Sequence, residues 1–100
     1  MQDIVDLTGA SGATYRFRRL PDGEPHLRIG GNYAVLKARP KGSFAVRLVG
    51  IENDLSQARR ACPAELLKGA HLYTRLNVSR IAREAEHQDL LANYGDCQPG

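Results

Sequence analysis

Short extended segments separated by turn signals fill the first half of this 100-residue chain. Residues 14–18 alternate in polarity and include β-branched and aromatic side chains, which predicts a half-buried strand. Pro21-Asp22-Gly23 then favours a tight turn. Residues 32–37 form an apolar run that predicts a buried central strand, and Pro40-Lys41-Gly42 separates it from a further strand candidate over 44–49. Two successive strands joined by so short a turn are expected to pair antiparallel.

The second half of the chain predicts helices on both sides of one more strand. A helix over 54–62 begins with residues whose side chains can cap it, and residues 63–68 predict a second short helix. Residues 71–76 alternate in polarity and predict the last strand, and a final helix over 79–94 begins at a capping serine. With a first strand over 4–7, the order is β-β-β-β-α-α-β-α, which predicts an α+β domain with a small mixed or antiparallel sheet flanked by helices.

Composition limits the number of domains and the class of protein. A chain of 100 residues with 42% hydrophobic and 25% charged side chains suffices for one globular domain, so residues 1–100 are expected to form a single unit. Its apolar runs are far shorter than the ~18 residues of a membrane helix. The first residues lack a secretory signal, and Cys62 and Cys97 are too few for a disulfide scaffold. We therefore expect a cytoplasmic domain without membrane contact.

Positive charge is concentrated in the middle of the chain. Residues 14–50 carry eight basic and two acidic side chains, a net charge of +6, although the whole chain carries only +3. No acidic residue occurs between Glu24 and Glu52. A cluster of this sign attracts polyanions such as nucleic acid, whereas the alternative interpretation is an ordinary solvated face of Lys and Arg.

Two short motifs on adjacent predicted strands resemble those of a known family. Gly31-Asn32-Tyr33 begins one strand, Leu48-Val49-Gly50 lies in the next, and a helix, a strand and a helix follow. This arrangement resembles the GIY-YIG nuclease domain over residues 30–97, with residues 1–29 as an additional N-terminal strand pair. The resemblance implies a β-β-α-β-α core. Active members of the family cleave phosphodiesters with a divalent metal, typically Mg²⁺, and use two tyrosines, an arginine and a glutamate.

The resemblance places the family tyrosine of the first motif at Tyr33. The other three catalytic positions hold different residue types, namely Leu48, Ala58 and His87. Arg59 and Glu86 lie one residue away from the arginine and glutamate positions, and on a helix such a shift rotates a side chain by about 100°. The resemblance therefore predicts a domain of this fold that has lost its catalytic activity.

Three functional hypotheses follow. The leading one is a non-catalytic GIY-YIG-like domain that binds DNA, RNA or another acidic partner by phosphate contacts, without a cofactor. The residues expected to make these contacts are Lys37, Arg39, Lys41, Arg47 and Arg59. The second hypothesis is a divergent nuclease dependent on Mg²⁺ or Mn²⁺, in which Tyr33 is the base and Arg59 and Glu86 assist. The third is a protein-interaction module without nucleic-acid affinity, which would use the N-terminal strand pair.

No metal site is expected from the spacing of the side chains that usually bind transition metals. The chain has three histidines and two cysteines, and they show neither a Cys-x-x-Cys nor a His-x-x-x-His pattern. These residues are His26, His71, His87, Cys62 and Cys97.

Overall fold

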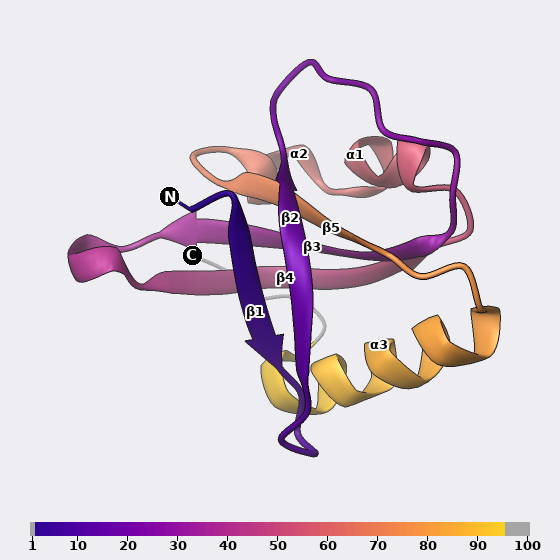
Figure 1. The fold of residues 1–100 in the computed structure, drawn as a ribbon. Helices are drawn as coiled ribbons and strands as arrows, with labels where there is room; N and C mark the ends of the chain where they lie inside the picture. The colour runs from indigo at the N-terminus through magenta and orange to yellow at the C-terminus, as the bar shows by residue number, and fades with distance from the viewer. Residues whose placement is uncertain (1, 96–100) are drawn as a thin grey trace.

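A computed structural model describes residues 2–95 and contains one sheet with helices on both of its faces (Figure 1). The strands are β1 (Ile4–Thr8), β2 (Thr14–Leu20), β3 (Gly31–Ala38), β4 (Phe44–Glu52) and β5 (His71–Leu76). The helices are the 3₁₀ turns η1 (Pro40–Gly42) and η2 (Leu55–Gln57) and the α-helices α1 (Ala58–Ala61), α2 (Ala64–Leu67) and α3 (Arg80–Tyr94). Every predicted element is present, and the helix expected over 54–62 consists of η2 followed by α1.

The sheet has the strand order β1-β2-β5-β3-β4, and all of its pairings are antiparallel. This confirms the predicted small α+β domain, in its antiparallel form. The expected pairing of β3 with β4 across the Pro40–Gly42 turn is also confirmed. Strand β5 lies between β2 and β3, and it therefore joins the β1–β2 and β3–β4 hairpins into one sheet.

The two faces of the sheet are covered by different helices (Figure 1). Successive side chains of a strand point to opposite faces. Along β3, Ala34 and Leu36 belong to a core cluster that contains Leu90 of α3. Tyr33 and Val35 belong to a second cluster, which contains residues of η2 and α1. Strand β3 is thus buried on both of its faces, with α3 on one side and η2, α1 and α2 on the other.

The β1–β2 hairpin packs against α3 on the same face of the sheet as β3 and β4. Leu7 and Phe17 are fully buried in the same cluster as Leu90. The hairpin pairs with β5 only through residues 18–20, and its other end reaches the last turns of α3, where the Tyr94 hydroxyl accepts a hydrogen bond from the Thr8 amide at 3.1 Å. The N-terminal strand pair therefore supplies part of the main core.

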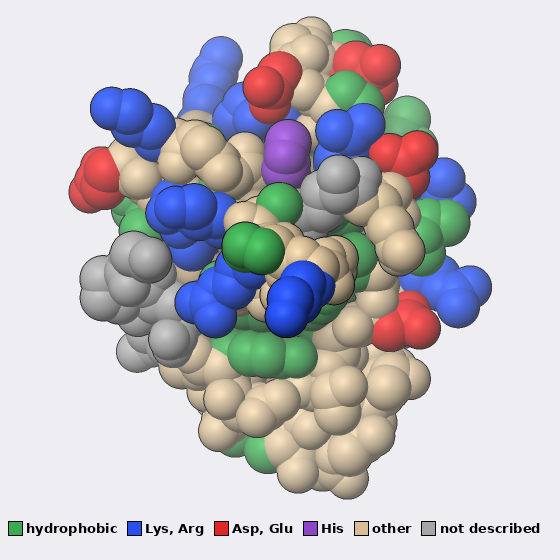
Figure 2. All heavy atoms as spheres, turned by 90° about the vertical axis from the view of Figure 1, so that its left-hand side faces the viewer, with side chains coloured by type: hydrophobic (Ala, Val, Ile, Leu, Met, Phe, Trp, Pro, Cys, Tyr) green, Lys and Arg blue, Asp and Glu red, His purple; other side chains and the backbone are tan. Residues whose placement is uncertain are grey.

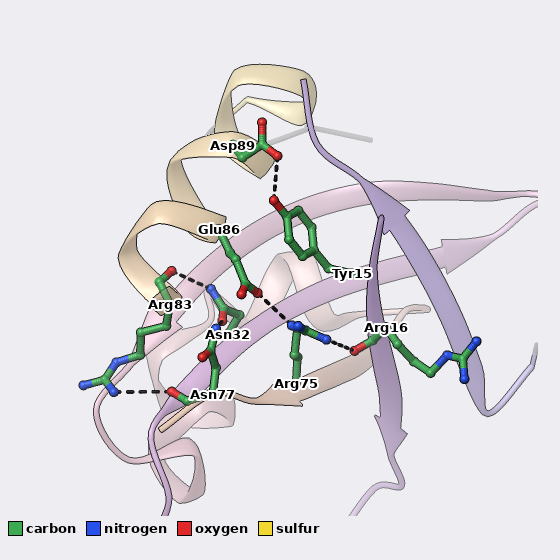
Figure 3. A network of polar contacts seen from close by, with 8 residues as sticks. All are labelled: Tyr15, Arg16, Asn32, Arg75, Asn77, Arg83, Glu86 and Asp89. Atoms are coloured by element: carbon green, nitrogen blue, oxygen red, sulfur yellow. Dashed lines mark hydrogen bonds and ion pairs between the residues drawn. The ribbon is translucent and has the colours of Figure 1, made fainter. Parts of the chain in front are cut away.

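Asp89 of α3 binds the β1–β2 hairpin, and Figure 3 shows its contact with Tyr15 of β2. Its carboxylate accepts hydrogen bonds from the amide and hydroxyl of Ser11, at 2.8 and 2.6 Å, and from the Tyr15 hydroxyl at 2.7 Å. The Ser11 hydroxyl, then the Tyr15 hydroxyl and the Ser11 amide, lower the pKa of Asp89 below its ordinary value. A carboxylate with a lowered pKa stabilises the fold above the pKa that it has in the unfolded chain.

We expect the stabilising contribution of Asp89 to be lost as the pH falls through about 4 and below. In Asp89→Asn the group does not titrate, so the variant should be less stable than the parent near neutral pH, and the difference should shrink in acid. Denaturant unfolding of both proteins between about pH 7 and pH 3 measures this. A difference in unfolding free energy that stays constant over the whole range would contradict the assignment.

Among residues 2–95, no helix combines the length and the apolar character needed to cross a membrane.

Candidate functional site

The motif residues of the two adjacent strands meet on the face covered by α1 and α2. Tyr33 pairs directly with Gly50, and its ring lies over that glycine. A Cβ atom added to Gly50 would lie 2.1 Å from Cζ of Tyr33. Ala58 is fully buried in the same cluster, and Leu48 packs against it. Tyr33, Leu48, Gly50 and Ala58 therefore form one packing unit.

Tyr33 is poorly suited to act as a base. The side chain is buried, and this burial, followed by the effects of Cys62 and Glu52, raises the pKa of its hydroxyl to about 12. A tyrosine that accepts a proton during catalysis needs a pKa close to the working pH. Cys62 is similar, because burial raises the pKa of its thiol to about 11 and the Sγ atom donates to the carbonyl of Ala58. Both groups are protonated near neutral pH.

Glu86 belongs to α3 (Figure 3), and α3 packs on the face of the sheet opposite to the cluster that contains Tyr33. Its carboxylate forms an ion pair with Arg75 of β5 at 2.8 Å. The Arg75 guanidinium also lies over the ring of Tyr15, 5.5 Å from the ring centre. His87 lies beside Glu86 on α3. The sheet thus separates Tyr33 from Glu86 and His87, the two α3 residues to which the family resemblance points. Tyr33, Arg59 and Glu86 therefore do not come together in one site.

No potential metal site is present within residues 2–95, where no group of three or more His, Cys, Asp or Glu side chains converges. Cys97 lies outside the described residues.

The basic residues differ in the partners that their side chains have. Five arginines form ion pairs with carboxylates, namely Arg16 with Asp6, Arg19 with Asp3, Arg59 with Asp22, Arg75 with Glu86 and Arg80 with Glu84. Within residues 2–95, by contrast, the side chains of Lys37, Arg39 and Lys41 make no hydrogen bond or ion pair. These three residues, which end β3 and form the turn into β4, are called the hairpin bases below.

The hairpin bases occupy an open end of the molecule. Arg39 and Lys41 are exposed, and Lys37 is half-buried. Figure 2 shows this end, where basic side chains gather around the tip of the hairpin and acidic side chains lie toward the margins. Lys41 has a φ of 66° and is followed by Gly42 with a φ of 77°, so the turn projects outward through two residues in the left-handed region. The charge of the hairpin bases is therefore available to a ligand without breaking an existing ion pair.

Arg47, which the sequence places with this group, points inward. The register of β3 and β4 shifts between Val35 and Leu36, which leaves Arg47 as the extra residue of a β-bulge. Its side chain is buried, and Nη1 donates to the carbonyls of Leu66 at 3.2 Å and Lys68 at 3.0 Å. Arg47 therefore ties α2 to the edge strand and lies outside the exposed basic surface.

Arg59 is also held by contacts within the chain, although its charge alone suggests a side chain free to bind phosphate. Arg59 donates to Asp22 at 3.3 Å and to the carbonyl of Leu20 at 3.1 Å, so it holds the chain that follows β2. Lys68 directly follows α2; its backbone carbonyl accepts from Arg47, and its side chain is exposed. The sequence did not indicate the contact between Arg47 and Lys68, because the two residues are 21 positions apart.

The fold and this surface define a small α+β domain with an uncompensated basic end. No protein-family model, curated protein or solved structure matches the chain.

Proposed function

We propose that this chain is a non-catalytic domain that binds nucleic acid through the hairpin bases. The observation that supports this is the grouping of unpaired charge: Lys37, Arg39 and Lys41 lie within five consecutive residues and have no acidic partner within the described residues. Arg18, Arg28, Arg60 and Lys68 also lack an ion pair there, but they belong to separate segments of the chain. Phosphate contacts release counterions from the nucleic acid, and unpaired basic side chains on an exposed turn can make such contacts directly.

Within this proposal the chain is a degenerate relative of the GIY-YIG nuclease domain. Two observations support the loss of catalysis. The Tyr33 hydroxyl has a pKa of about 12, and it packs against Gly50. The Glu86 carboxylate is engaged by Arg75 on the far face of the sheet. A phosphodiester bound at the hairpin bases would therefore meet neither an activated base nor a metal carboxylate.

The decisive variant combines Lys37→Gln, Arg39→Gln and Lys41→Gln. We expect it to bind a labelled DNA duplex or RNA strand more weakly than the parent, and to lower the slope of log affinity against log salt by about 2–3. Fluorescence anisotropy at several salt concentrations measures both quantities. The matched control is Arg28→Gln, Arg60→Gln and Arg80→Gln, which removes the same charge from exposed positions elsewhere.

Equal losses in the two triple variants would mean that only net charge matters, and this would contradict a site at the hairpin. Unchanged binding in the hairpin variant would do the same. Cleavage of the duplex in Mg²⁺ or Mn²⁺ that disappears in Tyr33→Phe would overturn the non-catalytic assignment.

A further inference from the structure

Part of the sheet face on which α1 and α2 pack has no helix over it. This part is formed by β2 and the C-terminal end of β5. The helices α1 and α2 have four residues each and are thus about 6 Å long. They cover Leu72 and pack beside Leu20, but the strands continue beyond them to Leu76 and to Arg16. This leaves a stretch of sheet surface without a covering helix.

A pocket of about 430 Å³ occupies this uncovered stretch. Three of the five large hydrophobic side chains that are exposed within residues 2–95 line it, namely Ile4, Leu27 and Leu76. Leu27 is 62% exposed and Leu76 is 54% exposed. Single exposed leucines are ordinary, but the convergence of several on one concave surface is typical of an interaction site.

One wall of the pocket comes from the connection between β2 and β3. Nε2 of His26 lies 3.0 Å from the Thr74 hydroxyl, and this contact holds the connection beside β5. The connection is also fixed at its end, where the carbonyl of Ile29 accepts from the Leu55 amide and that of Gly30 accepts from the Asn77 amide. These contacts therefore hold the connection that forms this wall of the pocket.

The polar rim of the pocket is positively charged. Arg16 and Arg18 of β2 line it, and both side chains are exposed. Arg16 forms an ion pair with Asp6, whereas Arg18 has no ion pair or side-chain hydrogen bond within the described part of the chain. An apolar floor beside an unpaired arginine is complementary to a ligand that presents a carboxylate next to an apolar side chain.

We propose that this pocket is a docking site for a short acidic segment of a partner protein that alternates carboxylate and apolar side chains. The open shape of the site favours an extended peptide, because a small molecule is usually enclosed on most of its surface. The site is independent of the proposed nucleic-acid surface. Leu76 pairs with Gly31 at the beginning of β3, whereas the hairpin bases lie at its other end, about 20 Å away.

The test uses the full chain and two blocked peptides, acetyl-Asp-Leu-Asp-Leu-Asp-amide and its analogue with Asn in place of every Asp. Amide NMR titration should show shifts that cluster at residues 16–18, 26–27 and 74–76 with the acidic peptide, and weaker binding of the Asn analogue. Arg18→Gln and Leu76→Ser should each weaken binding about fivefold or more. Both residues are exposed, so the fold should tolerate these changes.

The matched controls are Arg60→Gln and Ile81→Ser, which change an exposed arginine of α1 and an 84% exposed isoleucine outside the pocket. Their affinities should stay within about twofold of the parent. The proposal is overturned if the acidic peptide does not bind at millimolar concentration, if its shifts fall on the hairpin bases, or if the controls weaken binding as much as the pocket variants do.

Discussion

Replacing Phe17 with alanine is expected to lower the unfolding free energy by about 3–5 kcal/mol. Phe17 lies on β2, is fully buried, and packs in the cluster that contains Leu7 and Leu90. Removing its ring would leave a cavity between the N-terminal hairpin and α3. A loss of this size is a large fraction of the stability of a small domain. Denaturant unfolding followed by circular dichroism measures it.

The matched control for this prediction is Ile81→Ala, an exposed position on α3, where the change should stay within about 0.5 kcal/mol. A cost below about 1 kcal/mol for Phe17→Ala would contradict the packing described here. It would mean that the N-terminal strand pair folds as an extension, separately from the rest of the sheet.

Replacing Gly50 with alanine should destabilise the protein by about 2–3 kcal/mol, near the upper end of the usual cost of overpacking. The added Cβ would lie 2.1 Å from Cζ of Tyr33 and 2.5 Å from its hydroxyl oxygen. The ring is buried against η2 and α1, so it cannot move aside without disturbing that cluster. Thermal or denaturant unfolding of the variant checks this value.

A double-mutant cycle with Tyr33→Ala separates the steric clash from other effects. When the ring is absent, the space over Gly50 is open, and Gly50→Ala should cost little. The coupling free energy between the two positions should therefore reach about 1–3 kcal/mol. If the two single-variant costs simply add, the ring and the glycine do not share this space.

The order and type of the elements could be predicted because their signals are local. Residues 71–76 alternate in polarity and form β5 with the same bounds, and Ser79 caps α3 by accepting from the Ala82 amide. The arrangement of the helices on the two faces could not be predicted. Residues 31–36 are all buried, so their pattern does not indicate which face of β3 each helix covers. That arrangement separates Tyr33 from Glu86.

The candidate site was predictable only as a segment of positive charge. Arg39 and Lys41 lie on an exposed turn, and Lys37 lies half-buried near the end of β3 just before it. Arg47 and Arg59 have the same charge, but their partners are distant in sequence: the carbonyl of Leu66 is 19 residues from Arg47, and Asp22 is 37 residues from Arg59. Composition cannot distinguish a base that binds a ligand from one that holds two elements together.

The position of β5 has a consequence for how the chain folds. The β1–β2 and β3–β4 hairpins are each local in sequence and can form early, but β5 is the last strand and pairs with both β2 and β3. Until residues 71–76 are available, each hairpin keeps one unpaired inner edge, and α3 has not yet covered the apolar residues beneath them. Such non-local pairing slows folding, and it makes the insertion of β5 the step that converts two separate hairpins into one cooperative unit.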